Sequence, residues 1–347
     1  MTAYFIRRLL LMIPTFLGIT FVVFFTMRSA PGGPIEQARM AKMQAMQQQG
    51  GAGGGMGAGA GPSNGDDALS PEEMAAVMKE YGISDNIMAD YGRWVSDMAR
   101  LDFGQSNVYG VDVMKLVISK MPISIFFGLI SMFMIYGICI PLGLTKAIKH
   151  RGFFDNASSL AVYFGYAIPG YALGALLIVF VASNWQLLPL GGFVSENFAE
   201  LSFGARVADL IQHAILPMCC YLIGSFAFMT MLMKNQVMEQ MSADYVRTAL
   251  AKGVPYKRAI FKHALDNSLI PIATTFGNQI SLLVGGSFLI ESIFNIDGIG
   301  MLGFMSALNK DYPVVMGVLA ISATLQLLGN IISDLCVAAV DPRVKFG

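Results

Sequence analysis

The residues of this chain that could do chemistry are scattered, apart from one basic stretch. Residues 244–271 read DYVRTALAKGVPYKRAIFKHALDNSLIP and lie between two long apolar segments. Lysine and arginine at this density suit contact with a groove on a soluble protein, or with lipid headgroups. Gly253 suits a helix end, and Pro255 cannot continue the helix before it. The spacing predicts a helix–turn–helix elbow with helices over about 234–252 and 256–266, in which Ile260, His263 and Ala264 share one face.

The sequence shows no group of residues with the types and spacing of a catalytic or metal-binding site. The three histidines, His150, His213 and His263, are spread over loops and helix ends, whereas a metal site needs several ligands close together. The four cysteines lie in apolar runs without Cys-x-x-Cys spacing, as small core residues do: Cys139, Cys219, Cys220 and Cys336. Because no Gly-Lys dipeptide of a P-loop occurs either, we predict no catalytic residue, no metal and no ATP site in this chain.

The elements that must position these residues are membrane-spanning helices. Hydrophobic residues make up 55% of the chain and charged residues 13%, against about 25% charged residues in soluble domains. Mean hydropathy is +0.58. The net charge of zero leaves no basic field to attract nucleic acid. The composition therefore predicts an all-α integral membrane protein in the lipid bilayer, without a nucleic-acid partner.

Six stretches are long and apolar enough to span a bilayer, which takes about 20 residues. They cover about 9–27, 123–145, 158–181, 210–233, 269–290 and 314–337. The first could instead be a cleaved signal peptide, but it exceeds the usual apolar region of about 7–15 residues, which favours a retained helix. Prolines within several of these stretches indicate helices packed in a bundle, where neighbours satisfy the freed carbonyls.

Positive charges in short loops predict the orientation of these helices. One side collects thirteen: Arg7, Arg8, Lys146, Lys149, Arg151, Lys234, Arg247, Lys252, Lys257, Arg258, Lys262, Arg343 and Lys345. The short loops of the other side hold only Arg206 and Lys310. We therefore expect residues 1–27 to contain a cytoplasmic N-terminus and the first helix, and residues 339–347 to form a cytoplasmic tail. The core of 121–338 then carries a cytoplasmic loop over 234–268.

The segment 28–120 is then an extracytoplasmic insertion between the first two helices. Residues 50–65 contain nine glycines and cannot bury enough side-chain surface to fold, so they are predicted to be a disordered loop. Ser70 and Pro71 suit the cap and first position of a helix. Residues 71–100 are predicted to form two short helices that break near Gly82.

Polar residues in the fifth apolar stretch are candidates for a transport pathway. Asn278, Gln279 and Ser281 cluster there, and Glu291 follows at its outer end. Polar groups within a bilayer usually face the bundle interior, although they also bond neighbouring helices. Asp334 in the last helix is predicted to be an interfacial cap or ion-pair member. An ion-coupled secondary carrier or a channel for small polar solutes would need ionisable residues near helix centres, where none lies.

The basic stretch resembles a known motif. Arg247, Thr248 and Ala249, followed by Gly253, Ile260, His263 and Leu265, fall at the spacing of the EAA loop of ABC importer permeases. The usual Glu-Ala pair is Arg247-Thr248 here, a departure shared with the branch that imports peptides and nickel, whose usual wording is DYVRTA-x-AKG. The resemblance implies that Thr248, Ala249, Gly253, Ile260, His263 and Leu265 couple the chain to an ATPase.

The resemblance covers nearly the whole chain. The start FIRRLLLMIP, the turn Ala30-Pro31-Gly32-Gly33-Pro34, the runs at 102–106 and 311–314 and the ending Asp341-Pro342-Arg343 are similar to the dipeptide/oligopeptide permeases of B type. The long glycine-rich insertion is similar to the Yej-type subgroup, which is linked to oligopeptides and microcin C-type peptide–nucleotide conjugates. The resemblance implies a type I ABC importer permease fold with six transmembrane helices in the bacterial inner membrane.

The same resemblance implies several partners. They are a homologous second permease subunit, two cytoplasmic ABC ATPase domains, in separate chains or fused in one, and a periplasmic solute-binding protein. ATP and magnesium would bind to the ATPase domains, because the chain itself is not an enzyme. Transport would proceed by alternating access between two packings of the bundle.

Labelling of engineered cysteines tests the predicted topology. In a variant without native cysteines, Ala60→Cys is expected to react with a membrane-impermeant thiol reagent added outside the cytoplasmic membrane, whereas Arg258→Cys is expected to react only after permeabilisation. The charge asymmetry of the short loops is the reason. The opposite pattern would invert the topology.

Overall fold

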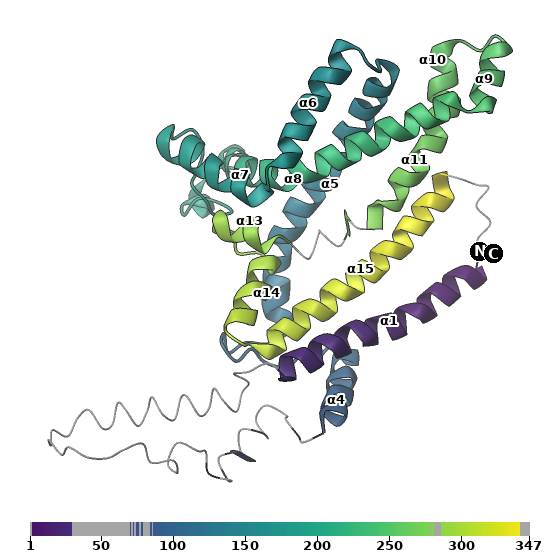
Figure 1. Ribbon diagram of the computed structural model, residues 1–347. Helices are drawn as coiled ribbons and strands as arrows, with labels where there is room; N and C mark the ends of the chain where they lie inside the picture. Colours follow the sequence, from purple (N-terminus) through teal and green to yellow (C-terminus); the bar gives the residue numbers. More distant parts are fainter. Residues whose placement is uncertain are drawn as a thin grey trace, which may run out of the picture. The chain divides into compact units, whose positions relative to one another are not determined.

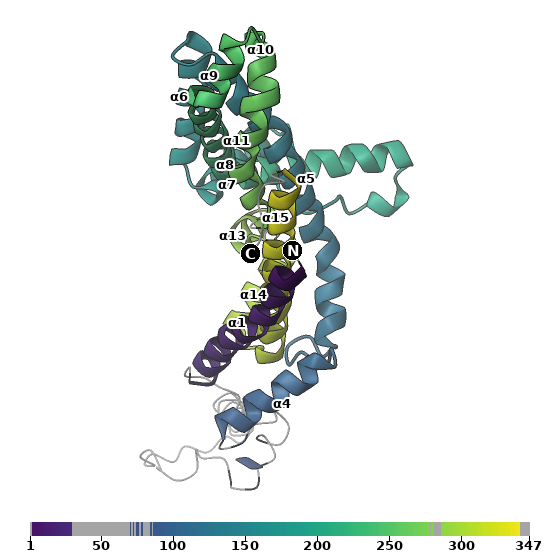
Figure 2. The ribbon, with the colours of Figure 1, turned by 90° about the vertical axis from the view of Figure 1, so that its right-hand side faces the viewer.

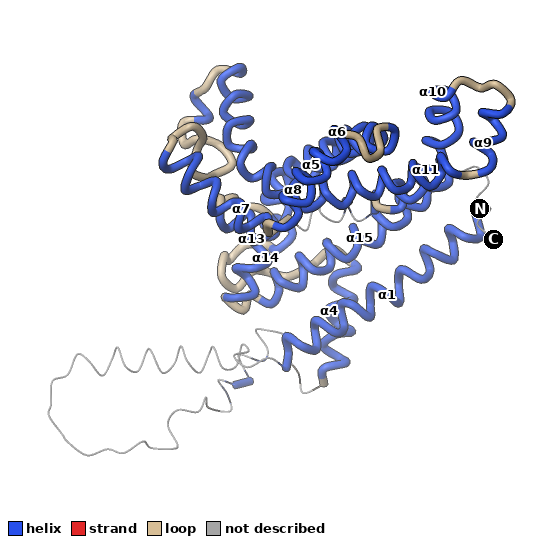
Figure 3. The backbone as a smooth tube through the Cα atoms, turned by 45° about the horizontal axis from the view of Figure 1, so that its top comes forward, coloured by secondary structure: helices blue, strands red, loops and turns tan. Residues whose placement is uncertain are grey.

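The computed structural model describes residues 2–29, 70, 72, 74, 75, 78, 84, 86–277, 279, 280 and 286–340, and these contain helices but no strand (Figure 3). The helices are α1 (Thr2–Ser29), α4 (Ile87–Ala99), α5 (Val113–Ile148), α6 (Phe153–Ala167), α7 (Gly170–Leu177), α8 (Phe203–Ser242), α9 (Asp244–Ala251), α10 (Tyr256–Ala259), α11 (Leu265–Thr274), α13 (Phe288–Ile293), α14 (Ile299–Leu308) and α15 (Tyr312–Val340). Ile178–Asn184 and Ile260–Ala264 are π-helical, and Phe198–Glu200 is a 3₁₀ turn. The glycine-rich stretch 50–65 and the tail 341–347 lie outside the described residues.

Four helices of the described part are long and apolar enough to cross a membrane by themselves. They lie in α1 (Ile6–Ser29), α5, α8 and α15, and a fifth span is possible if α6 and α7 together count as one. These match five of the six predicted stretches. The stretch 269–290 is described only as α11, residues 275–277, 279, 280 and 286–287, and part of α13, so the count of six stays a prediction.

The third predicted span is interrupted by a sharp bend. The chain bends by 91° between Phe153–Ala167 and Gly170–Asn184. Pro169 lacks an N–H, and its ring would clash with the carbonyl one turn earlier. It also disfavours helical backbone at the preceding residue, and Ile168 is extended with φ −96° and ψ 118°. Pro14, Pro141 and Pro217, by contrast, lie inside continuous helices.

The chain consists of two compact units, of which the larger comprises Met1–Pro14, Lys115–Met305 and Val318–Gly347. Within it, α8 is the central helix and packs against α6, α7, α11 and α13 (Figure 1). Its buried core includes Phe127 of α5, Met229 of α8 and Phe294 at the end of α13. At 40 residues, α8 is longer than the bilayer requires, so it connects this core to the segments that follow its C-terminal end.

The smaller unit comprises Thr15–Met114 and Ser306–Gly317. In it, the α4 helix is attached to the end of α1 by both apolar and polar contacts. The Tyr91 ring meets Phe21 edge to face at 5.2 Å, and its hydroxyl donates to the Leu17 carbonyl at 2.8 Å. The Asp90 carboxylate is buried and lies 3.3 Å from the Arg28 guanidinium. The α4 helix is therefore held in place by side chains of α1.

A buried aspartate also organises the turn before α5 in the smaller unit. Asp311 accepts hydrogen bonds from the Ser106 hydroxyl and from the backbone N–H groups of Asn107 and Val108, both at 3.2 Å. The two motifs that contain these residues, at 102–106 and 311–314, are therefore in contact. The two motifs occur together in the sequence because each supplies part of the same turn.

Substitution of Asp90 tests the attachment of α4. Burial raises the pKa of this carboxyl, but hydrogen bonds from Ser84 and Arg93 and the charge of Arg28 outweigh it and leave the pKa below its ordinary value. The depressed pKa means that the carboxylate stabilises the unit above about pH 4 and loses this effect as the pH falls through the lowered pKa. Asp90→Asn is expected to cost about 1–3 kcal/mol at neutral pH.

The measurement is the rate of trypsin cleavage at Arg93 and Arg100 in membrane vesicles, which should rise in Asp90→Asn. Asp97→Asn, at an exposed position of the same helix, is the control and should leave the rate unchanged. Equal cleavage rates in both variants would show that Asp90 does not hold α4.

Candidate functional site

The predicted elbow is present at the C-terminal end of α8. The α8 helix stops at Ser242, since Ala243 adopts extended backbone with φ −70° and ψ 148°. The α9 helix then runs beside α10 (Figures 1 and 2). The prediction of one continuous helix over 234–252 is therefore wrong. The second arm extends beyond the predicted end at 266, because α10, the π-helical turn and α11 continue to Thr274.

Gly253 makes the turn between the two arms. Its φ is +83°, which glycine adopts without the strain that a side chain would bring. Its N–H donates to the Leu250 carbonyl at 2.9 Å, and the N–H of Val254 donates to the Ala249 carbonyl at 3.1 Å. These two bonds close the end of α9. The helix end expected at Gly253 is confirmed.

A small core of its own holds the elbow together. It consists of Val246, Ala259 and Ala264, with Met241 and Val254 packed around it. The Tyr245 hydroxyl adds a polar link, because it donates to Gln240 Oε1 at 2.6 Å and accepts from Asn267 Nδ2 at 2.9 Å. The end of α8, α9 and α11 are thereby connected, so the elbow is a fixed part of the larger unit.

The residues of the resembling motif divide into inward-facing and outward-facing groups. Ile260 is only 1% exposed and packs in the main core. Leu265 also packs against that core, and the His263 side chain is half-buried. Thr248 is exposed, with its hydroxyl bonded to the Asp244 carbonyl at 2.8 Å, and Ala249 is half-buried. Ile260 can therefore act only by packing, and not by touching a partner.

The exposed apolar side chains of the elbow are residues that the motif does not single out. Tyr256 is 51% exposed and Phe261 52% exposed, with Leu250 also at the surface. The same segment carries five exposed cations: Arg247, Lys252, Lys257, Arg258 and Lys262. Exposed aromatic side chains together with cations are suited to a protein groove that carries acidic groups. Sequence reasoning identified this stretch as basic but did not identify its apolar contact residues.

The predicted pathway residues are described only in part. Asn278 and Ser281 lie outside the described residues, so their predicted shared face stays a prediction. Gln279 is half-buried and borders a small cavity of about 40 Å³. Its other lining residues include Ser124, Ser131, Tyr221 and Ser225, together with Phe127 and Ile135. It is a small, mainly apolar space inside the larger unit, with room for water but not for a solute molecule.

Glu291 is a buried carboxylate beside a larger cavity, although the sequence placed it at the outer end of a helix. It is 1% exposed, and it accepts hydrogen bonds from the Met301 N–H at 2.7 Å and the Ser287 N–H at 3.3 Å. A Cβ added at Gly298 would lie 2.6 Å from its carboxyl carbon. The carboxylate thus fixes α13 against the start of α14, and glycine provides the space for it.

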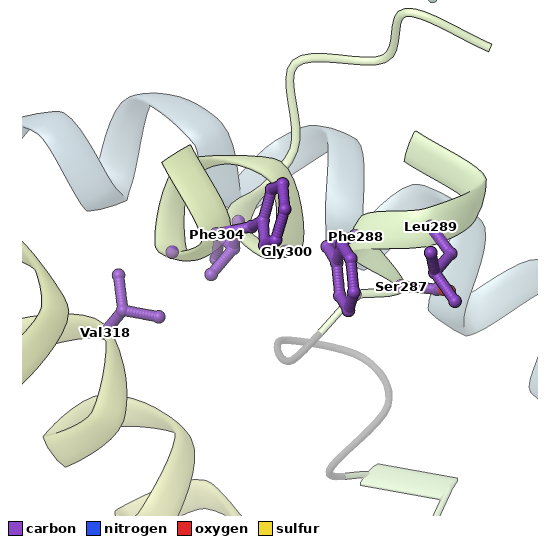
Figure 4. A pocket seen from close by; sticks show the side chains of 9 residues that line it. Ser287, Phe288, Leu289, Gly300, Phe304 and Val318 are labelled. Carbon is purple, nitrogen blue, oxygen red and sulfur yellow. The ribbon is translucent and has the colours of Figure 1, made fainter. Parts of the chain in front are cut away.

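The cavity beside Glu291 has a volume of about 430 Å³ and is shown in Figure 4. Its wall contains Phe288 and Phe304, whose rings stack at 4.5 Å, together with Val318 of α15. Ser287 contributes a hydroxyl and Gly300 leaves part of the backbone uncovered. The site is mostly apolar with few polar groups, and no sequence pattern indicated it, because its residues meet only in the folded chain.

Two further predictions concern charged side chains. Asp334 accepts a hydrogen bond from the Tyr4 hydroxyl at 3.0 Å and forms an ion pair with Arg8, so the predicted ion-pair role is confirmed. His213 Nδ1 lies 2.9 Å from the Asp209 carbonyl and 3.6 Å from its carboxylate. Among the described residues, no group of three His, Cys, Asp or Glu side chains could hold a metal ion.

Comparison with known proteins places this chain among transport proteins. Residues 139–346 match the family described as "Binding-protein-dependent transport system inner membrane component". The inner membrane ABC transporter permease protein YejB of Escherichia coli O157:H7 is 39% identical, with 100% of this chain and 99% of that protein covered. The peptidoglycan transport system permease protein YejB of Agrobacterium fabrum is 36% identical over 100% of this chain and 99% of that protein.

A third relative comes from a Gram-positive bacterium. The oligopeptide transport system permease protein AppB of Bacillus subtilis is 33% identical over 100% of both chains. The match extends over the whole length of each relative, so it includes the elbow, the cavity beside Glu291 and the apolar helices. The chain therefore belongs to the inner membrane components of binding-protein-dependent transport systems, as a multi-pass ABC transporter permease.

Proposed function

We propose that this chain is the permease subunit of an ATP-driven importer that carries oligopeptides across the bacterial inner membrane. The observation that supports this most is the full-length similarity to permeases named for oligopeptide and dipeptide transport, from B. subtilis and E. coli K12. These relatives are named as permeases of peptide transport systems. The permease therefore takes precedence over an ion-coupled carrier.

The elbow is the proposed contact with the ATPase. Tyr256, Phe261 and Leu250 would enter a groove on one ATPase domain, and the surrounding cations would meet its acidic rim. Thr248, Ala249 and Gly253 shape the outer turn, whereas Ile260, His263 and Leu265 join it to the core. ATP and magnesium would bind to the partner, and closure of the ATPase would move the elbow.

The other partners follow from the kind of transporter. A homologous second permease would complete the pathway, and a periplasmic solute-binding protein would deliver the peptide to the outer side. Two ATPase domains, in separate chains or fused, would lie on the cytoplasmic side with both termini. The insertion 28–120, including α4, would then face the periplasm, consistent with the charge asymmetry of the short loops.

The proposed pathway lies near the polar residues of the fifth apolar stretch. Gln279, with Asn278 and Ser281, would offer partners to the amide groups of a peptide backbone, while side chains would be accepted broadly. The cavity lined by Phe288 and Phe304 could receive apolar side chains on the way. The peptidoglycan transport named for the A. fabrum relative and microcin C-type conjugates are narrower cargoes within the same chemical class.

Gly253→Val tests the coupling role of the elbow. A β-branched residue at positive φ is strained by about 1–3 kcal/mol, and no atom lies within 4 Å of the added Cβ, so the strain is confined to the backbone. Stimulation of ATPase activity by the loaded binding protein should fall to near the basal level in the reconstituted complex.

The matched control is Gly204→Val, because Gly204 also has open space around it but no positive φ. It should keep the stimulation. If Gly253→Val were stimulated as fully as the wild type while inserted normally, the elbow would not be the transmitting element.

Peptide uptake by cells tests the proposed substrate class. A strain without any other peptide importer should take up labelled short peptides only when this chain and its partner subunits are present. Deletion of this chain should abolish the uptake and confer resistance to toxic peptide conjugates, and the intact gene should restore both. Unchanged uptake and sensitivity in the deletion strain would remove the peptide substrate but not the membership of the family.

A further inference from the structure

Three charged side chains are buried together where α5, α6 and α8 meet. Lys146 near the end of α5 is 0% exposed, Asp155 in the first turn of α6 is 2% exposed, and Lys234 of α8 is 8% exposed. All three belong to the larger unit. Neither the resemblance nor the predicted site includes any of them as a functional group. We call these three residues the charge cluster.

Asp155 is the centre of the charge cluster. Its two carboxylate oxygens lie 2.7 and 2.8 Å from Lys234 Nζ, and one of them lies 3.2 Å from Lys146 Nζ. The N–H of Arg151 donates to the same carboxylate at 3.0 Å. Asp155 thereby connects α6 to α8 through Lys234 and to the end of α5 through Lys146.

Lys146 is held by further groups of α6. Its Nζ donates to the Asp155 carbonyl at 3.0 Å and to the hydroxyls of Ser158 and Ser159, both at 2.8 Å. An ammonium group can donate three hydrogen bonds, so these acceptors use its full capacity. The orientation of α5 relative to α6 is therefore set by directional bonds, in addition to apolar packing.

The energetics of such a cluster indicate a role in geometry. Two ammonium groups and one carboxylate leave a net positive charge in a buried place, where removal of water is costly. Replacement of buried ion pairs by apolar groups of similar volume is often neutral or stabilising. An apolar cluster would therefore stabilise the fold equally well. It would, however, allow the helices to slide past one another, whereas paired charges fix their register.

The position of Lys234 relates the charge cluster to the elbow. Lys234 precedes the end of α8 at Ser242 by eight residues, a distance of about 12 Å along the helix. The α9 arm of the elbow starts at Asp244. Any force that a partner exerts on the elbow reaches the rest of the chain partly through this last section of α8. Lys234 lies on this section and bonds it to Asp155 of α6.

We propose that the charge cluster of Lys146, Asp155 and Lys234 is a clamp that transmits movement of the elbow from α8 to α5 and α6. The proposal rests on the proposed function of the chain as an ATP-driven permease. The clamp makes α8, α6 and the end of α5 move as one body, so that a displacement of the elbow changes access to the pathway. Without it, the end of α8 moves alone, and ATP hydrolysis is uncoupled from transport.

The test compares transport with hydrolysis in the reconstituted complex of wild type and Lys146→Met/Asp155→Leu/Lys234→Met. The probe is labelled tri-alanine, delivered by the solute-binding protein, and the measured quantity is the ratio of peptide imported to ATP hydrolysed. The triple variant removes all three charges together, so no unpaired charge stays buried. It should assemble with an unchanged or raised melting temperature, while the ratio falls at least about fivefold, the lower bound of common coupling between sites.

Two further variants test whether the charge cluster acts as a clamp. Ser158→Ala/Ser159→Ala keeps all three charges but removes two acceptors from Lys146, and it should lower the ratio by a smaller factor. Lys149→Met removes an exposed lysine from the turn after α5 and should keep the wild-type ratio. An unchanged ratio in the triple variant, or its failure to assemble, would overturn the clamp. Absence of ATP-dependent uptake in the wild type would instead contradict the proposed function.

Discussion

Inside a bilayer, a backbone N–H or C=O group without a partner cannot turn to water, and the described structure depends on this constraint. The long apolar stretches are helical because a helix satisfies these groups within one segment. Where the helix is interrupted, a local bond replaces the missing one. At the break before Pro169, for example, the N–H of Ile168 donates to the Gly165 carbonyl at 3.3 Å, and the Pro169 carbonyl accepts from Leu173 at 3.0 Å. The bend therefore leaves these backbone groups satisfied.

The buried charged side chains of the larger unit likewise need bonding partners within the protein. Glu291 is enclosed, yet backbone N–H groups of two segments donate to its oxygens. Lys146 and Lys234 are enclosed, and Asp155 compensates for their charge in part. Each buried charge thus joins segments that are distant in the sequence. A carboxylate that accepts directional bonds fixes the positions of its partners more strictly than apolar packing would.

The elbow combines a rigid interior with an open outer face. Val246, Ala259 and Ala264 bury its inner side, and the Tyr245 hydroxyl connects its arms. Tyr256 and Phe261 remain exposed at the surface. A lone exposed aromatic residue needs no explanation, but two of them in a basic segment on a fixed turn are suited to a partner. Rigidity matters for such a contact, because a flexible elbow would absorb the movement that it has to transmit.

The sequence by itself determined the membrane class, four of the spans and the turn at Gly253, because hydropathy and local backbone preferences act over short distances. The ends of the spans were less exact, since α5 begins at Val113 and not near 123, and α8 ends at Ser242 and not near 233. The sequence did not determine the bend at Pro169, since prolines at positions 14, 141 and 217 lie inside continuous helices and only the surrounding packing separates the two outcomes. The sequence placed Ile260 and Phe261 on different faces of the second arm, but it did not determine that the face of Ile260 is the buried one. The sequence could not predict the burial and bonding partners of Glu291 or of the charge cluster, because these partners are brought together only by packing between helices. Tertiary structure alone decided which polar residues are buried, since burial depends on the neighbours that each helix meets.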